Sequence, residues 1–230
     1  MRRVRGLLGL AGELFITVAV VLALFVVWEL WWTDVVAGRE QSTQVAALES
    51  AFAPGAPRPS AEPSVVTPVP LGDAFAIVHI PRFGPDFARP LRQGVETEVL
   101  RRGIGHYSST AMPGEIGNVA IAGHRTTYGK PFNLIATLQV GDRIIVETAS
   151  DYFVYRMYAS EIVSPSSSEV IAPVPGKPDE QPARRLLTMT SCNPEFSSRE
   201  RFVVHAELAS VYPREGGLPA DLLVVDGGGR

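Results

Sequence analysis

The 230-residue sequence contains a single cysteine, Cys192, which excludes a disulfide within the chain and the paired-cysteine motifs of redox and zinc proteins. The sequence also lacks an excess of positive charge. Its formal net charge of −3 provides no basic field, so we exclude nucleic acid as a partner. Asp179 and Glu180 are adjacent but isolated, as is typical of a solvated loop, and we expect no metal or cofactor. The lone thiol is therefore either an inert buried side chain or a reactive group.

Charge is scarcest near the N-terminus. From Gly6 to Trp32 the chain is apolar apart from Glu13 and Glu29. At about 1.5 Å per helical residue, this segment is long enough to cross a hydrocarbon layer of roughly 30 Å. We predict that residues 1–33 hold the N-terminus and one transmembrane anchor.

The flanking charges predict the orientation of this anchor. Arginines precede the apolar segment at positions 2, 3 and 5, and Asp34 follows it. The positive-inside rule places the N-terminus in the cytoplasm and the remainder outside the cell membrane. The alternative is a signal peptide cleaved after the sequence VVA that ends at Ala37, and it also places the remainder outside.

Beyond the anchor we expect three parts. Residues 34–70 form a juxtamembrane and proline-rich spacer: Gly38–Phe52 is a possible short helix without a strong apolar stripe, and the segment after it has a proline every few residues. The spacer would hold the folded part away from the bilayer. Residues 71–213 form the folded domain, and residues 214–230 form a flexible tail.

The folded part has the pattern of strands. Six short segments rich in β-branched and aromatic residues are separated by turn residues: Ala74–Ile80, Asn118–His124, Asp142–Thr148, Tyr152–Tyr158, Arg185–Ser191 and Arg201–Leu208. Only Gly94–Gly103 and Pro131–Leu138 fit short helices. The pattern predicts an all-β barrel or sandwich.

The alternation of side chains along a strand predicts the face of the sheet on which Cys192 lies. Leu187 and Met189 share one face of their strand, so Cys192 belongs to the opposite face. On the next strand a wholly apolar set that includes Phe202 must face the core, which leaves Arg201 on the outer face. If the two strands pair, the thiol and the guanidinium share a surface, and the positive charge would lower the pKa of the thiol.

A reactive thiol needs a proton acceptor, and there are four histidines. His124 fits best, because it ends a strand of small residues, follows Gly123 and opens into a polar loop. The other three have less suitable settings. His79 lies among apolar residues, His106 lies in a turn-rich loop and suits either role, and His205 is about 13 Å along the strand from Arg201.

At these residues the sequence resembles a known family. The motif TMTSC, from Thr188 to Cys192, is followed nine residues later by Arg201, which resembles the TLxTC…R signature of sortases. These are membrane-anchored cysteine transpeptidases of Gram-positive bacteria. The segment NVAIAGHR resembles the strand that carries the sortase histidine. The wider sequence over residues 71–212 is most like class E sortases of actinobacteria, which implies a closed β-barrel of about eight strands.

The resemblance implies catalytic roles for three residues. Cys192 would be the nucleophile, His124 the acid/base group, and Arg201 the residue that positions substrate and stabilises the oxyanion. Arg199 lies two residues before Arg201, but the class E spacing favours Arg201. Two positions depart from the signature: Ser191 replaces threonine but keeps the hydroxyl, and Met189 replaces leucine, an exchange that a core tolerates.

The resemblance also implies the substrates. The enzyme would cleave an LAXTG- or LPXTG-like sorting signal of surface proteins between threonine and glycine, and pass the acyl group to an amine of a cell-wall precursor such as lipid II or to a pilin lysine. Tyr107 sits where the family is thought to read the alanine, and the motif residues Thr188, Thr190 and Ser191 are assigned with it to substrate binding. The long Ser164–Arg184 loop would form a wall of the substrate groove.

Three other functions are weighed against this one. An L,D-transpeptidase would carry its cysteine in an SHGC context, which is absent from the sequence. A papain-like peptidase would carry its cysteine on a helix near the mature N-terminus, whereas Cys192 ends a late strand. A non-catalytic wall-binding β-domain is the third alternative, and it predicts that Cys192 and His124 lie far apart.

Overall fold

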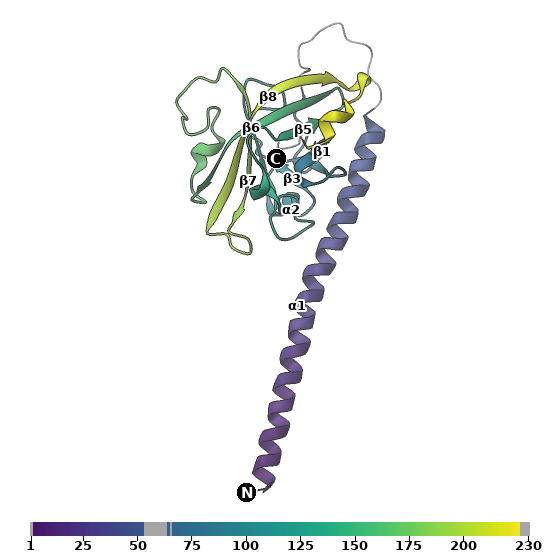
Figure 1. Cartoon of the computed structure of the whole chain (residues 1–230), viewed down its shortest axis with the longest axis vertical. Coiled ribbons are helices and arrows are strands. Elements are labelled where there is room, and N and C mark those ends of the chain that lie inside the picture. Colours follow the sequence, from purple (N-terminus) through teal and green to yellow (C-terminus); the bar gives the residue numbers. More distant parts are fainter. Residues whose placement is uncertain (1, 53–63, 65, 226–230) are drawn as a thin grey trace, which may run out of the picture.

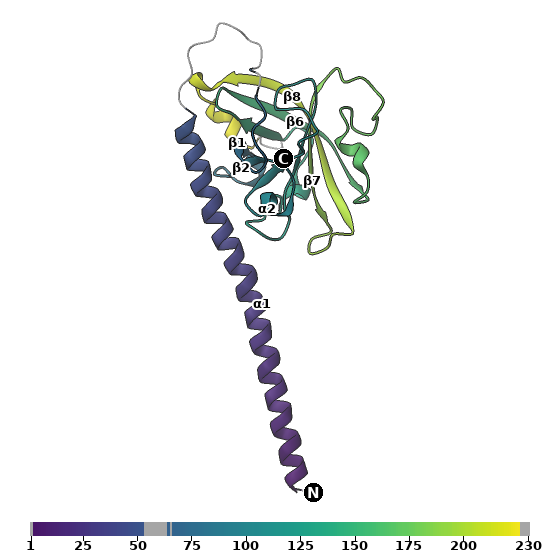
Figure 2. The same cartoon turned by 180° about the vertical axis from the view of Figure 1, so that it is seen from behind.

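The computed structural model describes residues 2–52, 64 and 66–225. Its first element is a single long helix, α1 (Arg2–Ala51). One end of α1 lies alongside a β-barrel, and the rest extends away from the barrel towards the N-terminus (Figures 1 and 2). Within Gly12–Ala51 the helix contains a stretch that is long and apolar enough to cross a membrane. The predicted apolar helix is therefore present, and it continues well beyond residue 33.

Eight strands close into the barrel. They are β1 (Ala74–His79), β2 (Ala88–Gln93), β3 (Ile104–His106), β4 (Gly117–Ala122), β5 (Arg143–Glu147), β6 (Asp151–Val163), β7 (Arg185–Asn193) and β8 (Glu200–Pro213). Their order around the barrel is β1-β2-β3-β4-β7-β8-β6-β5, and β5 pairs with β1 to close it. Two pairs, β2–β3 and β4–β7, are parallel, and the other six are antiparallel. The predicted eight-stranded closed barrel is confirmed.

Two of these strands have weak sequence patterns. β2 carries Pro90 and two arginines among its six residues, and β3 has three residues, one of them Gly105. Both are absent from the expected strands, because neither shows the β-branched run on which the prediction rests. The expected helices are also shorter than predicted: α2 spans Thr97–Leu100, and the 3₁₀ turn η2 spans Ile135–Thr137.

The barrel interior follows the predicted alternation. Leu187 and Met189 of β7 and Val204 and Ala206 of β8 are fully buried in the main core, with Phe202 packed against it. β7 and β8 pair in antiparallel register, as expected. The other face of β7 thus carries Thr188, Thr190 and Cys192 outside this core.

The juxtamembrane segment differs from the predicted spacer. Five residues of the segment are buried at helical spacing along one side of it: Ala37, Gln41, Val45, Leu48 and Phe52. Val45, Leu48 and Phe52 cluster with Ile77 of β1. This buried set does not appear as a strong apolar stripe in the sequence, because its first two residues are the small Ala37 and the polar Gln41. Up to Phe52 the segment is therefore packed on the barrel, and most of the proline-rich part, residues 53–63 and 65, lies outside the described residues.

The C-terminal segment also packs on the barrel, contrary to the predicted flexible tail. After β8 come two 3₁₀ turns, η4 (Arg214–Gly216) and η5 (Ala220–Leu223). Leu222 is buried against Ile145 and Val154. The guanidinium of Arg143 donates to the carbonyl oxygen of Val224 at 2.9 Å. The packed domain thus extends to residue 225, and residues 226–230 lie outside the described part of the chain.

Candidate active site

The parallel pair β4–β7 brings His124 and Cys192 together. Its register runs to Ala122 opposite Thr190, and the Gly123 N–H continues it by donating to the carbonyl oxygen of Thr190 at 3.2 Å. His124 comes two residues after the end of β4, between Gly123, whose carbonyl oxygen accepts from the Ser191 hydroxyl, and Arg125, which donates to the carbonyl oxygen of Cys192. Neighbouring backbones in a sheet lie about 4.8 Å apart. His124 therefore lies next to the strand end that carries the partly exposed thiol.

The antiparallel pair β7–β8 adds Arg201. Cys192 and Arg201 are direct cross-strand partners, so their side chains share a face. The Arg201 Nη1 donates to the carbonyl oxygens of Ser198 at 3.0 Å and Glu200 at 2.9 Å, which holds the guanidinium at the β7–β8 turn. Arg199 precedes the first residue of β8, so this register places Arg201, and not Arg199, opposite the thiol.

The environment of His124 favours its neutral form. The pKa of His124 is lowered, chiefly because burial disfavours the charged imidazolium, and further because of the positive charge of Arg101. Its Nε2 atom is buried and lacks a hydrogen-bond partner among the described residues. The ring of Tyr128 lies 5.1 Å from the imidazole ring, centroid to centroid. His124 is thus a partly desolvated imidazole whose Nε2 makes no hydrogen bond within the described residues.

Arg125 is a site residue that the sequence pattern does not reveal. Its Nη1 donates to the carbonyl oxygen of Cys192 at 3.1 Å and to the Asn193 side-chain oxygen at 2.7 Å. The residue after the histidine thereby holds the strand end that carries the thiol. The sequence offers one signal for Arg125, which is its position directly after His124. Sequence spacing does not show where so long a side chain reaches.

The predicted substrate-binding residues divide into three settings. The Tyr107 hydroxyl lies 3.2 Å from Thr190 Oγ1, so these two form one polar pair beside the thiol strand. The Ser191 hydroxyl donates to the carbonyl oxygen of Gly123 at 2.8 Å and ties β7 to the histidine strand. Thr188 is fully buried and bonds to the side chains of Asn118 and His205, at 2.9 and 3.0 Å. Thr188, Thr190 and Ser191 are buried, and Tyr107 is partly exposed.

The other histidines have bonded side chains elsewhere on the barrel. His79 Nε2 lies 2.9 Å from a Glu147 carboxylate oxygen. His106 is fully buried and bonds to Gln93 and to the carbonyl oxygen of Ala111, at 2.9 and 3.0 Å. His205 bonds to Thr188 and Glu161. Of the four, His124 is the one whose chain neighbours bond to the strand end that carries the thiol.

The Ser164–Arg184 loop covers part of the outer face of the β4–β7 pair. It contains the 3₁₀ turn η3 (Ser168–Ile171), in which Val170 is buried. The Asn118 amide nitrogen of β4 donates to the Ala172 carbonyl oxygen at 3.0 Å and fixes this turn. Beside it lies a cleft of about 330 Å³, whose lining includes Ser109, Asn118, Ile171 and Pro182. The loop thus borders a cleft, as a groove wall would.

A closed barrel that carries a thiol, a neutral imidazole and a guanidinium at one end of a parallel strand pair has the parts of a cysteine acyl-transfer enzyme. Comparison with known proteins defines the family. Residues 78–209 match the sortase domain. Sortase SrtE1 of Streptomyces coelicolor is 40% identical over 222 residues, which cover 93% of this chain and 60% of that protein. Sortase SrtE2 of the same organism is 30% identical, over 89% of this chain and 83% of its own length.

Solved structures agree with the sequence comparisons. SrtA sortase from Actinomyces oris matches with a TM-score of 0.66 at 40% identity, covering 70% of this chain and 93% of that one. Sortase E1 from S. coelicolor with a tripeptide in the active site matches with a TM-score of 0.61 at 40% identity, covering 66% and 98%. The chain belongs to the sortase family, and its relatives include class E sortases.

Proposed function

We propose that this protein is a membrane-anchored class E sortase that cleaves a sorting signal between threonine and glycine and transfers the acyl group to an amine. The observation that carries the proposal is the register of three strands. The β7–β8 register pairs Cys192 with Arg201, and the β4–β7 register ends at Ala122 opposite Thr190, two residues before His124 and Cys192. This proximity argues against a non-catalytic wall-binding domain, which would not need the three groups together.

The chemistry begins with the thiol. Because the pKa of His124 is lowered, its imidazole is neutral near pH 7 and can take the proton of the Cys192 thiol. The sulfur attacks the threonine carbonyl carbon, and the tetrahedral intermediate collapses as the carbon–nitrogen bond breaks. The imidazolium gives its proton to the leaving glycine amine. An incoming amine then attacks the thioester, His124 takes the proton from that amine, and the thiolate leaves. The imidazolium returns this proton to the sulfur, which restores the thiol and the neutral imidazole.

Arg201 is suited to the oxyanion that forms in each half-reaction. Its guanidinium has several donors in a fixed plane and stays charged, so it can bond to a peptide carbonyl and then to the developing negative oxygen. The two carbonyl bonds it makes at the β7–β8 turn use Nη1. We infer that the substrate oxygen is bound at the other guanidinium nitrogens or displaces these bonds.

We propose an LAXTG- or LPXTG-like signal, read in part by the Tyr107–Thr190 pair, and lipid II or a pilin lysine as the amine acceptor. The cleft beside the Ser164–Arg184 loop supports a peptide groove there. The apolar half of α1 supports a single membrane span, with the N-terminus in the cytoplasm and the barrel outside.

The test is a transpeptidation assay on the full chain in detergent micelles, since α1 and the C-terminal segment both pack on the barrel. An LAXTG-type peptide and a glycine-based amine are supplied, and the ligated product is quantified by chromatography. We expect ligation by the wild type and none by Cys192→Ala. A folded wild type that neither cleaves nor ligates LAXTG and LPXTG peptides would refute the proposed signal.

A further inference from the structure

The loop that follows His124 has an unfavourable backbone conformation. Three consecutive residues have positive φ: Tyr128 at 53°, Gly129 at 73° and Lys130 at 36°. Glycine adopts this region freely, but tyrosine and lysine do so at a cost. The loop also returns to the histidine, because the Phe132 N–H donates to the carbonyl oxygen of His124 at 3.0 Å. A loop of this kind needs support from the structure around it.

That support comes from α1. The Asp34 carboxylate accepts a hydrogen bond from the Gly129 N–H at 3.2 Å and pairs with the Lys130 ammonium at 3.0 Å. The Gln41 amide nitrogen donates to the carbonyl oxygen of Tyr128 at 2.9 Å. Asp34 and Gln41 are seven residues apart, two turns of helix, so they lie on the same side of α1. The helix thus bonds to each of the three residues with positive φ.

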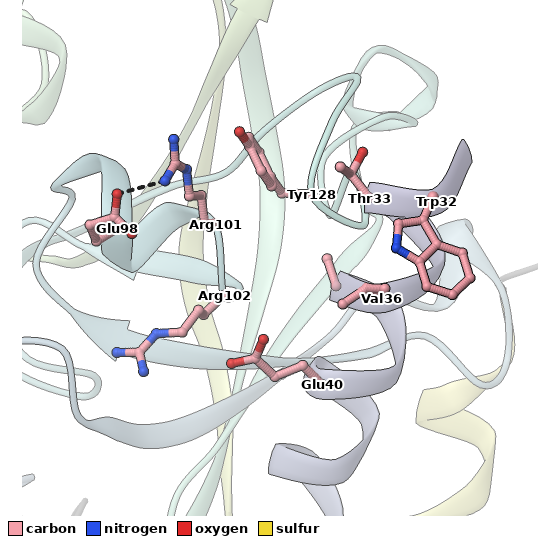
Figure 3. A pocket seen from close by; sticks show the side chains of 9 residues that line it. Trp32, Thr33, Val36, Glu40, Glu98, Arg101, Arg102 and Tyr128 are labelled. Carbon is pink, nitrogen blue, oxygen red and sulfur yellow. Dashed lines mark hydrogen bonds and ion pairs between the residues drawn. The ribbon is translucent and has the colours of Figure 1, made fainter. Parts of the chain in front are cut away.

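Packing at this contact is close. The Gln41 side chain is completely buried. A Cβ atom added to Gly129 would lie 2.9 Å from the side-chain amide nitrogen of Gln41. Glycine at position 129 therefore serves both the positive φ and the approach of the helix. Trp32, Thr33 and Val36 of α1 line a cleft of about 420 Å³ together with Tyr128 and Arg101 of the barrel (Figure 3). The loop lies in the helix–barrel interface.

The contact reaches the imidazole through Tyr128. The Tyr128 ring lies 5.1 Å from the His124 ring, and the Arg101 guanidinium lies 5.3 Å from the centre of the Tyr128 ring. Tyr128 in the same loop and Arg101 after α2 are the ionisable groups that act on His124. Arg125 follows it in the chain and bonds to the backbone of Cys192 at the neighbouring strand end. A shift of the loop would move Tyr128 and admit water to His124.

We propose that Asp34 and Gln41 are positioning residues of the active site: through the Tyr128–Lys130 loop, the juxtamembrane half of α1 holds His124 in its orientation beside Cys192. This inference rests on the proposed function. It makes the membrane anchor and the catalytic centre one mechanical unit, because Asp34 comes two residues after the end of the apolar segment. Loss of either side chain leaves both reactive groups in place but loosens their geometry.

The test compares Asp34→Ala and Gln41→Ala with wild type in detergent micelles. Ser42→Ala is the matched control, since Ser42 is exposed beside Gln41 and its hydroxyl donates only within α1, to the carbonyl oxygen of Gly38. We expect kcat to fall about tenfold with KM nearly unchanged, because misplacement of a catalytic group affects the chemical step most. Asp34→Asn keeps an acceptor for the Gly129 N–H and should recover part of the rate.

A pH profile separates positioning from general stability. Water admitted to His124 relieves the desolvation that lowers its pKa, so the acidic limb of kcat/KM should move to higher pH in Asp34→Ala and not in Ser42→Ala. An NMR titration of the His124 imidazole gives its pKa without any peptide, which keeps this test independent of the sorting signal. Wild-type kcat and an unmoved limb in folded Asp34→Ala and Gln41→Ala would overturn the proposal. If Gln41→Ala does not fold, the Asp34→Ala and Asp34→Asn pair decides.

Discussion

Two histidines of the same barrel, His124 and His205, differ in ways that separate a catalytic role from a structural one. His205 is 5% exposed, and its two ring nitrogens are bonded to Thr188 at 3.0 Å and Glu161 at 2.9 Å. His124 is partly exposed, and its Nε2 has no partner among the described residues. A general base needs a nitrogen that is free to accept a proton. The histidine with fewer bonds is therefore the one suited to act on the thiol beside it.

The largest effect should come from His124→Ala. Removal of the acid/base group should lower kcat/KM by about a thousandfold, because positioned general acid–base catalysis contributes on that order. The free energy of unfolding should change little, since Nε2 makes no bond to be lost among the described residues. Steady-state transpeptidation kinetics and urea denaturation check both expectations. Wild-type activity in His124→Ala would assign the acid/base role elsewhere.

His205→Ala should show the reverse pattern. The substitution leaves the buried Thr188 hydroxyl without one of its bonds and opens a cavity, which should cost about 2 kcal/mol of unfolding free energy. The kcat/KM of the folded protein should stay near the wild-type value. A severe loss of kcat/KM in a protein of unchanged stability would contradict the structural role of His205.

An intermediate effect is expected from Arg125→Ala. Without the bonds from its guanidinium to the Cys192 carbonyl and the Asn193 side chain, the strand end that carries the thiol is less well fixed. We expect kcat to fall by about tenfold. Arg125→Lys keeps the charge but loses the planar donor array, so it should recover only part of the rate. Equal activity in both variants and the wild type would show that the β4–β7 register alone fixes the thiol.

The smallest effect concerns the pH profile. Arg101 contributes to the lowered pKa of His124, so Arg101→Gln should raise that pKa and move the acidic limb of kcat/KM to higher pH. Arg102→Gln is the matched control, because it removes a neighbouring arginine that is not among the causes of the lowered pKa. A limb that moves equally in both variants would indicate a general change in surface charge.

Strands in which core-facing apolar residues alternate with residues of the outer face are predictable from the sequence. β7 and β8 follow the pattern of Leu187, Met189 and Phe202, and this pattern by itself predicts that Cys192 and Arg201 share a face. His124 is favoured because a strand of small residues ends there. These features are local, so a single chain segment contains the information.

Features that depend on distant contacts are not predictable in this way. The buried side of α1 includes Gln41, whose reason for burial is the carbonyl oxygen of Tyr128, 87 residues away. The segment after Pro213 has the composition of a loose tail, yet Leu222 packs on Ile145 and Val154. The short strand β3 forms because β2 and β4 lie on either side of it. Each depends on partners that no local pattern of charge or hydropathy identifies.

The proposed mechanism requires a covalent bond between the substrate and Cys192. Intact-protein mass spectrometry of the full chain, incubated with an LAXTG-type peptide and no added amine, tests it against Cys192→Ala and His124→Ala. We predict a mass increase equal to the peptide cut after threonine, located on Cys192, absent in Cys192→Ala and strongly reduced in His124→Ala. A peptide cleaved without any adduct, or an adduct that persists in Cys192→Ala, would contradict the mechanism.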